Sequence, residues 1–314
     1  MSWLDLHMHS EASLDGEYSP GQLARLCHEK GLKVAALSDH NSVRGVEEMM
    51  ACCARFGIRS IPAVELDCTF DGVDLHLLGY GIDYHDGRYA KLESRILSGK
   101  KENSRHAMKI LREAGIIFDE DKVLALSRNG IVVGETIAEA ALADERNHNN
   151  PLLLPYRPGG GRDDNPYVNF FWDFCSQGKP AYFPADYPTF EEAQQLIEDT
   201  GGISVIAHPI NTVGKNRDRI RAMVKMGVSG LEVFSSYHTA EDVKWFHELA
   251  EELKLLETMG SDFHGKTKPS VVLGGTNTGL LNTDAAPGEN GSPSQEERTL
   301  ALLDYLLKIH AVFR

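Results

Sequence analysis

The sequence predicts an α/β protein in which short strands and helices alternate around a barrel, with a mainly helical segment inserted in the middle. Short apolar, β-rich runs alternate with amphipathic helical patterns in the first third of the chain, and the same alternation returns after about residue 186. Helical periods dominate the intervening residues. These observations predict six or seven strands in a barrel-like order.

The first part of the barrel, residues 1–84, is expected to contain four strands and two helices. The strands are expected at residues 3–9, 33–38, 61–66 and 75–80. One helix is expected between Ser19, which can cap it, and Gly31, which can end it. The second is expected at residues 43–56.

The rest of the chain divides into three parts. The inserted segment, residues 85–185, is expected to hold helices at 101–113, 120–127 and 135–147 and a Gly- and Pro-rich loop at 149–165. The second part of the barrel, residues 186–280, is expected to hold strands at 203–207, 230–234 and 256–260, with helices at 217–225 and 240–254. Its first helix begins with a capping box at Thr189. Residues 281–314 are expected to form a solvated loop and a last helix.

The composition narrows the classes of function. Hydrophobic residues make up 42% and charged residues 25% of the 314, as in ordinary globular proteins. The formal net charge of -14 disfavours binding to long nucleic acids, whose phosphates such a surface would repel. No run is long and apolar enough for a membrane span, so we expect a cytoplasmic protein with neither a membrane nor a protein partner.

Histidines and carboxylates interrupt the strands near their C-terminal ends. His7 and His9 end the first strand, where the two-residue period places both imidazoles on one face. Similar side chains end or follow the later strands: Asp39, His40, Glu65, His76, His208, Asp262 and His264. Barrel-type α/β enzymes build their active sites at this side of the strands.

These side chains predict a metal site. Gathering so many imidazoles and carboxylates without ions would cost several kcal/mol in unsatisfied polar groups and repulsion. Divalent cations remove that cost. Mixed nitrogen and oxygen donors suit Mn²⁺, Fe²⁺ or Zn²⁺, and the absence of thiolates from the pattern argues against a structural cysteine-type zinc site.

Five motifs, taken in order, resemble the polymerase and histidinol phosphatase (PHP) superfamily. They are D-L-H-M-H-S-E-A-S-L-D-G at 5–16, L-S-D-H-N-S-V-R-G at 37–45, V-E-L at 64–66, I-A-H-P at 206–209 and G-S-D-F-H-G at 260–265. Within the superfamily the chain is most similar to stand-alone metal-dependent phosphoesterases with a helical insertion. The resemblance implies a distorted (βα)7 barrel and activity on small phosphorylated metabolites, including nucleoside bisphosphates and cyclic sugar phosphates.

The resemblance also implies nine ligands for two or three divalent cations. A first cation would be held by His7, His9, Glu65 and Asp262, a second by Glu65, His76 and His208, and a third by Asp15, His40 and His264. Manganese is favoured, with iron or zinc as alternatives.

The expected chemistry is hydrolysis of a phosphate ester. Two cations bridged by Glu65 would generate a metal-bridging hydroxide near neutral pH, so Glu65 and Asp262 are also the candidate catalytic residues. His238, just beyond a strand end, could donate a proton to the leaving oxygen, although a helix-capping or exposed histidine is an alternative. The candidates for phosphate recognition are Arg44, Arg157, Arg162 and Lys215.

The leading hypothesis is therefore a phosphoesterase for a small phosphorylated substrate, as a monoesterase, a diesterase or both. One alternative is an exonuclease that acts on short oligonucleotides from an end. A second alternative is a non-catalytic binding module that contains metal.

Overall fold

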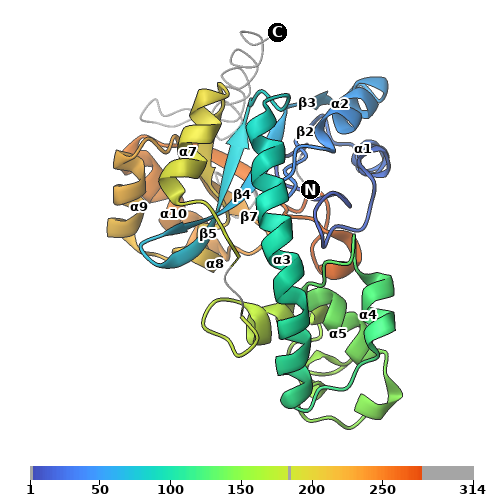
Figure 1. The fold of residues 1–314 in the computed structure, drawn as a ribbon. Coiled ribbons are helices and arrows are strands. Elements are labelled where there is room, and N and C mark those ends of the chain that lie inside the picture. Colours follow the sequence, from blue (N-terminus) through green and yellow to red (C-terminus); the bar gives the residue numbers. More distant parts are fainter. Residues whose placement is uncertain (1–2, 183–184, 278–314) are drawn as a thin grey trace.

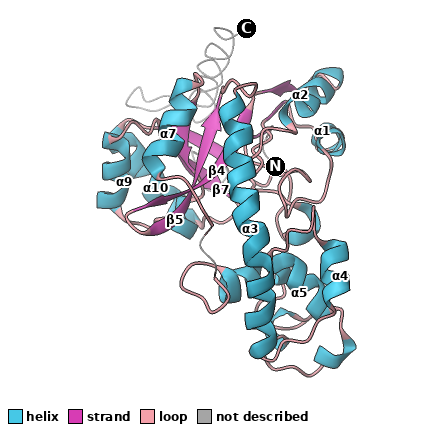
Figure 2. Cartoon of the chain, in the orientation of Figure 1, coloured by secondary structure: helices cyan, strands magenta, loops and turns pink. Residues whose placement is uncertain are grey.

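The computed structural model describes residues 3–182 and 185–277 (Figure 1). The loop and helix predicted at 281–314 lie outside the described residues. Within the described ranges, no helix has the length and apolarity that crossing a bilayer requires. The structure matches the α/β class: a sheet region with helices around it, and a helical region to one side (Figure 2).

A small parallel sheet forms from the first strands of the chain. It has the order β1-β2-β3, with β1 at Leu4–Asp5, β2 at Val34–Ala35 and β3 at Arg59–Ser60. Helix α1 (Pro20–Glu29) joins β1 to β2, and α2 (Val46–Arg55) joins β2 to β3 and packs on it. Ser19 caps α1 as predicted, through a capping box.

A five-stranded sheet follows, in the order β4-β5-β6-β7-β8. Its strands are β4 (Ala63–Phe70), β5 (Val73–Tyr80), β6 (Ile203–Ile206), β7 (Gly230–Ser235) and β8 (Leu256–Gly260). Strand β5 is antiparallel to both β4 and β6, whereas β6, β7 and β8 are parallel. The tight turn at Asp71 and Gly72, both with positive φ, explains the antiparallel β4-β5 hairpin.

The predicted barrel differs from the observed strand pairing in two ways. The described strands number eight rather than six or seven, because residues 59–60 pair with β2 as a strand of their own. They also form two sheets, not one continuous ladder. Main-chain hydrogen bonds nevertheless link both sheets: Leu6 N donates to Met259 O (3.0 Å), and Asn41 N donates to Glu65 O (2.7 Å).

The outer helices of the large sheet are α7 (Phe190–Asp199), α8 (Pro209–Thr212), α9 (Arg217–Lys225) and α10 (Ala240–Leu253). The capping box predicted at Thr189 is confirmed. Helix α7 packs on β4, β5 and β6, and α10 packs on β7 and β8. Their apolar faces enclose a core with fully buried Tyr80, Phe190 and Phe246, and burying large apolar side chains is the main stabilising contribution to such a core.

The inserted segment has a second core of its own. Its helices are α3 (Gly87–Glu113), α4 (Glu120–Leu126), α5 (Gly134–Leu142) and α6 (Pro166–Phe170), with the short helices η1 (Glu145–Asn147), η2 (Leu154–Tyr156) and η3 (Phe171–Cys175). The helix predicted from residue 101 already begins at Gly87, because Asp86 caps it. The helix predicted at 135–147 ends at Leu142, and η1 follows it.

Helix α3 connects the two cores. Tyr89, near its start, packs in the core of the large sheet, whereas Met108 and Leu111, near its end, pack in the core of the inserted segment. Figure 1 shows α3 running from one region into the other. The boundaries predicted at residues 85 and 185 stay predictions.

We predict that β8 tolerates no side chain at Gly260. A Cβ there would clash with the Cβ of His7 and with Oε1 of Glu232. Gly260→Ala should therefore lower the free energy of unfolding by about 1–3 kcal/mol, measured by denaturant titration. Gly87→Ala is the matched control, because a Cβ at Gly87 meets nothing within 4 Å. Equal stability of the two variants would contradict this packing.

Candidate metal centre

The strand ends bring the nine predicted ligands together. Glu65 in β4 lies at the middle of the cluster and is fully buried. On one side, its Oε2 atom lies 3.1 Å from His7 Nε2 and 3.2 Å from His9 Nε2. Asp262, which follows β8, places Oδ1 3.4 Å and 2.9 Å from the same two nitrogens. These four residues form one group of possible metal ligands.

The other oxygen of Glu65 faces a second group. Its Oε1 atom lies 3.0 Å from Nδ1 of His76 in β5 and 3.1 Å from Nε2 of His208, which follows β6. The three donor atoms lie close enough together to hold one ion. Glu65 thus presents one oxygen to each of two groups, the arrangement that a bridging ligand requires.

A third group lies on the far side of His9. The ring of His9 stacks between the rings of His264 and His40, with centroid distances of 4.0 and 4.5 Å respectively. Asp15 adds an oxygen 3.2 Å from His264 Nε2. His40 belongs to another group as well, with His76 and Asp67; the sequence analysis did not single out Asp67, although it lies two residues after Glu65 in the same strand.

The donor atoms fit metal ions because protein groups leave them unsatisfied. In the described part of the chain, seven of the nine predicted ligands have a buried nitrogen or oxygen with no hydrogen-bond partner. These atoms are His7 Nε2, His9 Nε2, Asp15 Oδ1, Glu65 Oε2, Asp262 Oδ1, His264 Nε2 and, in His208, Nδ1 rather than the Nε2 atom that faces Glu65. Buried polar atoms without partners are costly, so such a concentration indicates ligands for cations.

The opposite ring nitrogens of three histidines are held by the protein. His7 Nδ1 donates to Glu232 Oε1 (2.9 Å), and His264 Nδ1 donates to the carbonyl oxygen of Asp262 (2.8 Å). Ser13 Oγ donates to Asp39, so it accepts from His9 Nδ1 (3.0 Å). Hydrogen bonds of this kind fix the tautomer and leave Nε2 free for a metal.

Glu232 is a functional residue that the sequence analysis missed. It is fully buried in β7, and its second oxygen accepts from the backbone N of His208 (2.7 Å). It therefore orients a histidine of the first group and the backbone of one in the second. Its signal in the sequence was a lone carboxylate inside the apolar run G-L-E-V-F.

Asp262 is held by groups from the loops around it. Lys268 Nζ and Tyr237 OH lie 2.7 and 2.6 Å from Oδ2 of Asp262, which leaves Oδ1 facing the histidines. The backbone of Asp262 has φ 58°, a left-handed conformation that costs energy in a residue with a side chain. Its N–H donates to His7 O (2.8 Å), which holds the loop in place.

The metal-free cluster carries protons. Burial alone would lower the pKa of His40, but the carboxylates of Glu65 and Asp67 raise it to about 10. Burial, with the neighbouring rings of His264 and His40, lowers the pKa of His9 to about 4. Burial opposes ionisation of Glu65, yet the surrounding histidines hold its pKa well below the usual value. The cluster is thus a network of charged carboxylates and partly protonated imidazoles.

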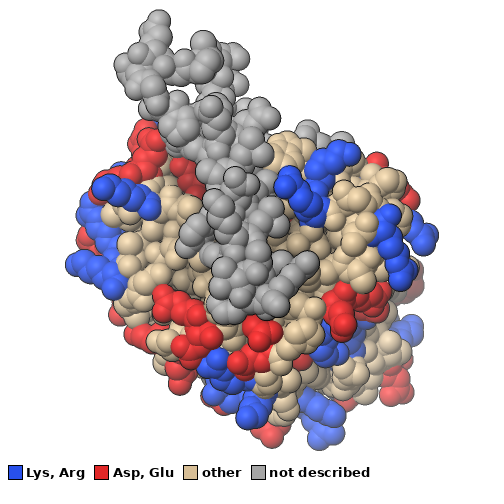
Figure 3. Space-filling view, turned by 90° about the horizontal axis from the view of Figure 1, so that it is seen from above, with Lys and Arg blue, Asp and Glu red and all other residues tan. Residues whose placement is uncertain are grey.

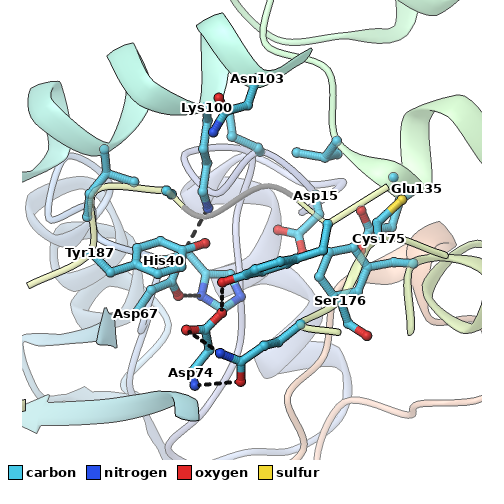
Figure 4. A pocket seen from close by; sticks show the side chains of 18 of the residues that line it. Asp15, His40, Asp67, Asp74, Lys100, Asn103, Glu135, Cys175, Ser176 and Tyr187 are labelled. Carbon is cyan, nitrogen blue, oxygen red and sulfur yellow. Dashed lines mark hydrogen bonds and ion pairs between the residues drawn. The ribbon is translucent and has the colours of Figure 1, made fainter. Parts of the chain in front are cut away.

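A cavity of about 530 Å³ opens beside the cluster (Figure 4). Asp15, His40 and His76 line one end, and side chains of the inserted segment line the rest. Figure 4 shows Lys100 reaching from α3 toward Asp67, and its Nζ lies 3.2 Å from Asp67 Oδ2. Burial, and then the charge of Asp15, raises the pKa of Glu135 in the cavity wall to about 7. The inserted segment therefore shapes the approach to the cluster.

The structure places His238 in the core. Its ring is buried and stacks on Phe246, and Nδ1 donates to the carbonyl oxygen of Val233 (2.8 Å). Burial lowers its pKa. Among the residues that line the cavity, His238 is absent, so its predicted proton transfer has no support from this geometry.

The four basic residues predicted to recognise phosphate are engaged elsewhere. Arg44 pairs with Glu93, Arg162 with Asp173 and Lys215 with Asp242. Arg157 donates to the carbonyl oxygen of Asn147. None of the four is among the residues that line the cavity, whereas Lys100 and Lys268 are. No motif in the sequence distinguished these two lysines from the other basic residues.

Comparison with known proteins shows which family and which solved structures the chain resembles. Residues 5–133 match the model of the PHP domain. A solved structure of an amidohydrolase from Chromobacterium violaceum, with bound sulfate and no metal, is similar, with a TM-score of 0.70, 27% identity and coverage of 83% of this chain and 87% of that one.

Three curated relatives are similar over most of their length. A 5'-3' exoribonuclease of Haemophilus influenzae is 29% identical, over 83% of this chain and 89% of that protein. A 3',5'-nucleoside bisphosphate phosphatase of C. violaceum is 28% identical, over 84% and 88%. A phosphoribosyl 1,2-cyclic phosphate 1,2-diphosphodiesterase of Eggerthella lenta is 27% identical, over 83% and 94%.

Residues 5–133 thus carry a PHP domain, and over most of its length the chain is similar to phosphoesterases. Its curated relatives are hydrolases of phosphoric esters, and they align with 83–84% of the chain.

We predict that Glu232 sets metal affinity. Glu232→Gln should weaken Mn²⁺ binding about 10–100-fold, as measured by calorimetric titration, because the histidines lose their charged acceptor. Glu257→Gln is the matched control: Glu257 also pairs with a histidine, His247 Nδ1 at 3.0 Å, on the outer helix α10. Unchanged affinity in Glu232→Gln, with helix content preserved, would refute the orienting role.

We predict that metal binding releases protons. In the metal-free protein the pKa of His40 is raised to about 10, so its ring is protonated at neutral pH. A cation can bind that ring only after the proton leaves, so Mn²⁺ affinity should rise with pH between 6.5 and 8.5, by about tenfold per pH unit for each proton released. Titrations in two buffers of different ionisation enthalpy measure the release. A pH-independent affinity would contradict the proposed charge state.

Proposed function

We propose that this protein hydrolyses a phosphate ester of a small phosphorylated metabolite, such as a nucleoside bisphosphate or a cyclic sugar phosphate. It would use two or three divalent cations, with manganese favoured over iron or zinc. The observation that carries the proposal is the convergence of unpartnered buried donor atoms on Glu65, beside a cavity of small-molecule size. The relatives support it because they share phosphoester hydrolysis but differ in substrate.

The roles of the residues follow from their contacts. Glu65, His7, His9 and Asp262 would hold one cation, and Glu65, His76 and His208 a second. Asp15, His40 and His264 would hold a third: the donor atoms of His40 and His264 lie close together with that of His9, and Asp15 lies 3.2 Å from His264 Nε2. When bound, the cations stabilise charge on phosphoryl oxygens and lower the pKa of water. Buried hydrogen bonds that the imidazoles donate to Glu232, Ser13 and the Asp262 carbonyl keep the rings oriented.

Two lysines supply further positive charge at the cluster. Lys100 and Lys268 both line the cavity, beside Asp67 and Asp262 respectively. An ammonium group in a site shielded from water attracts phosphoryl oxygens more strongly than an exposed one does. We propose these two lysines, in place of the four basic residues predicted from the sequence, as the protein groups that contact the substrate phosphate.

An exonuclease on short oligonucleotides is the second candidate, because three relatives bear exoribonuclease activity in their names. A long nucleic-acid strand fits this surface poorly: on the face in Figure 3, acidic and basic side chains alternate, and the net charge is -14. The relatives are hydrolases, which favours an enzyme over the non-catalytic metal module.

We predict that ligand variants abolish turnover without unfolding the protein. His7→Ala and Asp262→Ala should each lower kcat for p-nitrophenyl phosphate with added Mn²⁺ by at least about 10³-fold, because each removes a donor from the first group. Helix content, measured by circular dichroism, should stay unchanged. His247→Ala, a histidine on the outer helix α10, is the control and should keep wild-type activity.

Near-wild-type kcat values in both ligand variants at saturating metal would contradict the proposal. Comparison of p-nitrophenyl phosphate with bis-p-nitrophenyl phosphate separates monoesterase from diesterase activity. A trial with short RNA oligomers tests the exonuclease.

A further inference from the structure

Asp67 is a buried carboxylate that lies beside the nine predicted metal ligands and is not one of them. It belongs to β4, two residues after Glu65, and is 4% exposed. Its Oδ1 atom lies 3.1 Å from Nδ1 of His40. Its Oδ2 atom accepts hydrogen bonds from Asn41 Nδ2 (2.9 Å) and from Lys100 Nζ (3.2 Å). Partners on both oxygens fix the orientation of this carboxylate and offset the cost of burying its charge.

The loop after β2 is held against β4 around this carboxylate. Asn41 N donates to Glu65 O (2.7 Å), and the backbone N of Asp67 donates to Asn41 Oδ1 (2.9 Å). Asn41 has φ 56°, a left-handed conformation that asparagine adopts more readily than most residues with a side chain. With the bond from Asn41 Nδ2 to Asp67, these contacts keep the neighbouring His40 at a fixed distance from the carboxylate.

The Nδ1 atom of His40 has one acceptor that a bound cation would leave available. Nδ1 also lies 3.3 Å from Glu65 Oε2, but that oxygen faces the first group of metal ligands. With the first cation bound, Asp67 is the carboxylate left to accept the Nδ1 proton. A histidine whose Nδ1–H is held in this way presents Nε2 to a metal. The donor atom of His40 lies close to those of His9 and His264, at the third group.

Asp67 could instead be a metal ligand, because its donor atom lies close to those of His40 and His76. Two contacts argue against this. His76 Nδ1 lies 3.0 Å from Glu65 Oε1 in the second group, and an imidazole that keeps its ring proton binds a cation through one nitrogen only. The ammonium of Lys100 lies at the other oxygen of Asp67, where it would repel a cation. These contacts favour a hydrogen-bond acceptor over a ligand.

We infer that Asp67 is a positioning residue for the third cation, which it favours by holding the ring of His40, and that Lys100 limits this effect by offsetting the charge of Asp67. Figure 4 shows Lys100 reaching from α3 toward Asp67 and His40. Because α3 belongs to the inserted segment, that segment sets the affinity of the third cation as well as the shape of the cavity. This inference rests on the proposed function, whose third cation site it explains.

The first part of the test removes the acceptor. Mn²⁺ is titrated calorimetrically into the metal-free full-length chain, and bound ions are counted by elemental analysis after dialysis. The wild type should bind three ions. Asp67→Ala should weaken the third about 10–100-fold. The ion carries twice the charge of the proton that it displaces from His40, so loss of the carboxylate costs the ion more. Asp67→Asn, whose amide oxygen can still accept from Nδ1, should recover part of this affinity.

Asp74→Ala is the matched control for Asp67→Ala. Asp74 is a carboxylate of the same cavity, on β5, and it accepts a hydrogen bond from Tyr182 OH (2.7 Å). Its removal should leave the affinity of the third ion within about threefold of the wild type, because it orients no metal ligand. This control separates the loss of an acceptor for His40 from the loss of negative charge in the cavity.

The second part of the test removes the ammonium group. Lys100→Met should strengthen binding of the third ion about three- to tenfold, because the charge of Asp67 is no longer offset. Structural damage would weaken binding in both variants, so opposite signs for Asp67→Ala and Lys100→Met identify the positioning role. Lys109→Met is the control: this exposed lysine lies on the same helix and pairs with Glu113 (3.8 Å).

Three results would overturn the inference: a wild type that binds only two Mn²⁺ ions at millimolar metal, an unchanged third affinity in Asp67→Ala, or a weakened one in Lys100→Met. The first of these needs no variant, so a folding defect cannot obscure it. The outcome is separable from that of the proposed function, because no substrate is present. If the metal-loaded protein hydrolyses no phosphate ester while the affinities change as predicted, only the proposed function fails.

Discussion

The structure depends on keeping one carboxylate, that of Glu65, buried among histidines. Five imidazoles, from the segments after β1, β2 and β6 and from β5, lie within 3.3 Å of its two oxygens. Without cations this arrangement leaves buried donor atoms unsatisfied and raises the pKa of His40 to about 10, because carboxylates surround its ring. Divalent ions satisfy both the geometry and the charge, so the fold around Glu65 is best understood as a preformed set of ligands.

Two sets of residues support this arrangement, one close to the cluster and one farther from it. Close to the cluster, Glu232, Asp39 and Asp5 are buried carboxylates that accept hydrogen bonds from histidines, serines and backbone N–H groups, and so hold the strand ends in register. Farther out, α3 crosses from the core of the large sheet to that of the inserted segment and carries Lys100 to the cluster. Specificity can change in the inserted segment while the metal ligands stay on the strands.

Much of the ligand set could be predicted because it follows local rules. His7 and His9 alternate on one strand, and Glu65 and His208 end runs whose apolar pattern marks buried strands. Glu232 and Asp67 carried similar signals that could have been used. Lys100 and Lys268 carried none, because their position depends on how α3 and the loop after β8 pack on the cluster. Of the basic residues near the Gly-rich loop, Arg162 pairs with Asp173 and Arg157 donates to the carbonyl oxygen of Asn147, and neither lines the cavity.

The fold class could be predicted from the sequence, but the strand pairing could be predicted less well. Capping boxes and glycine stops located the helices around Ser19 and Thr189 well. The two-residue strands β1 and β2 were overestimated in length, because their apolar runs continue into loops whose backbone forms few strand hydrogen bonds. Strand β3 was not predicted. The π-helical turn that begins at Phe171 has no sequence signature. It could be recognised only in the three-dimensional structure.

The most direct test of the central claim is a crystal structure of the protein soaked in Mn²⁺, with anomalous diffraction recorded at the manganese edge. The account predicts two or three anomalous peaks, at least one of them at coordination distance from each oxygen of Glu65. Refined density without any such peak, with the histidine Nε2 atoms bonded to water or turned away from Glu65, would contradict it.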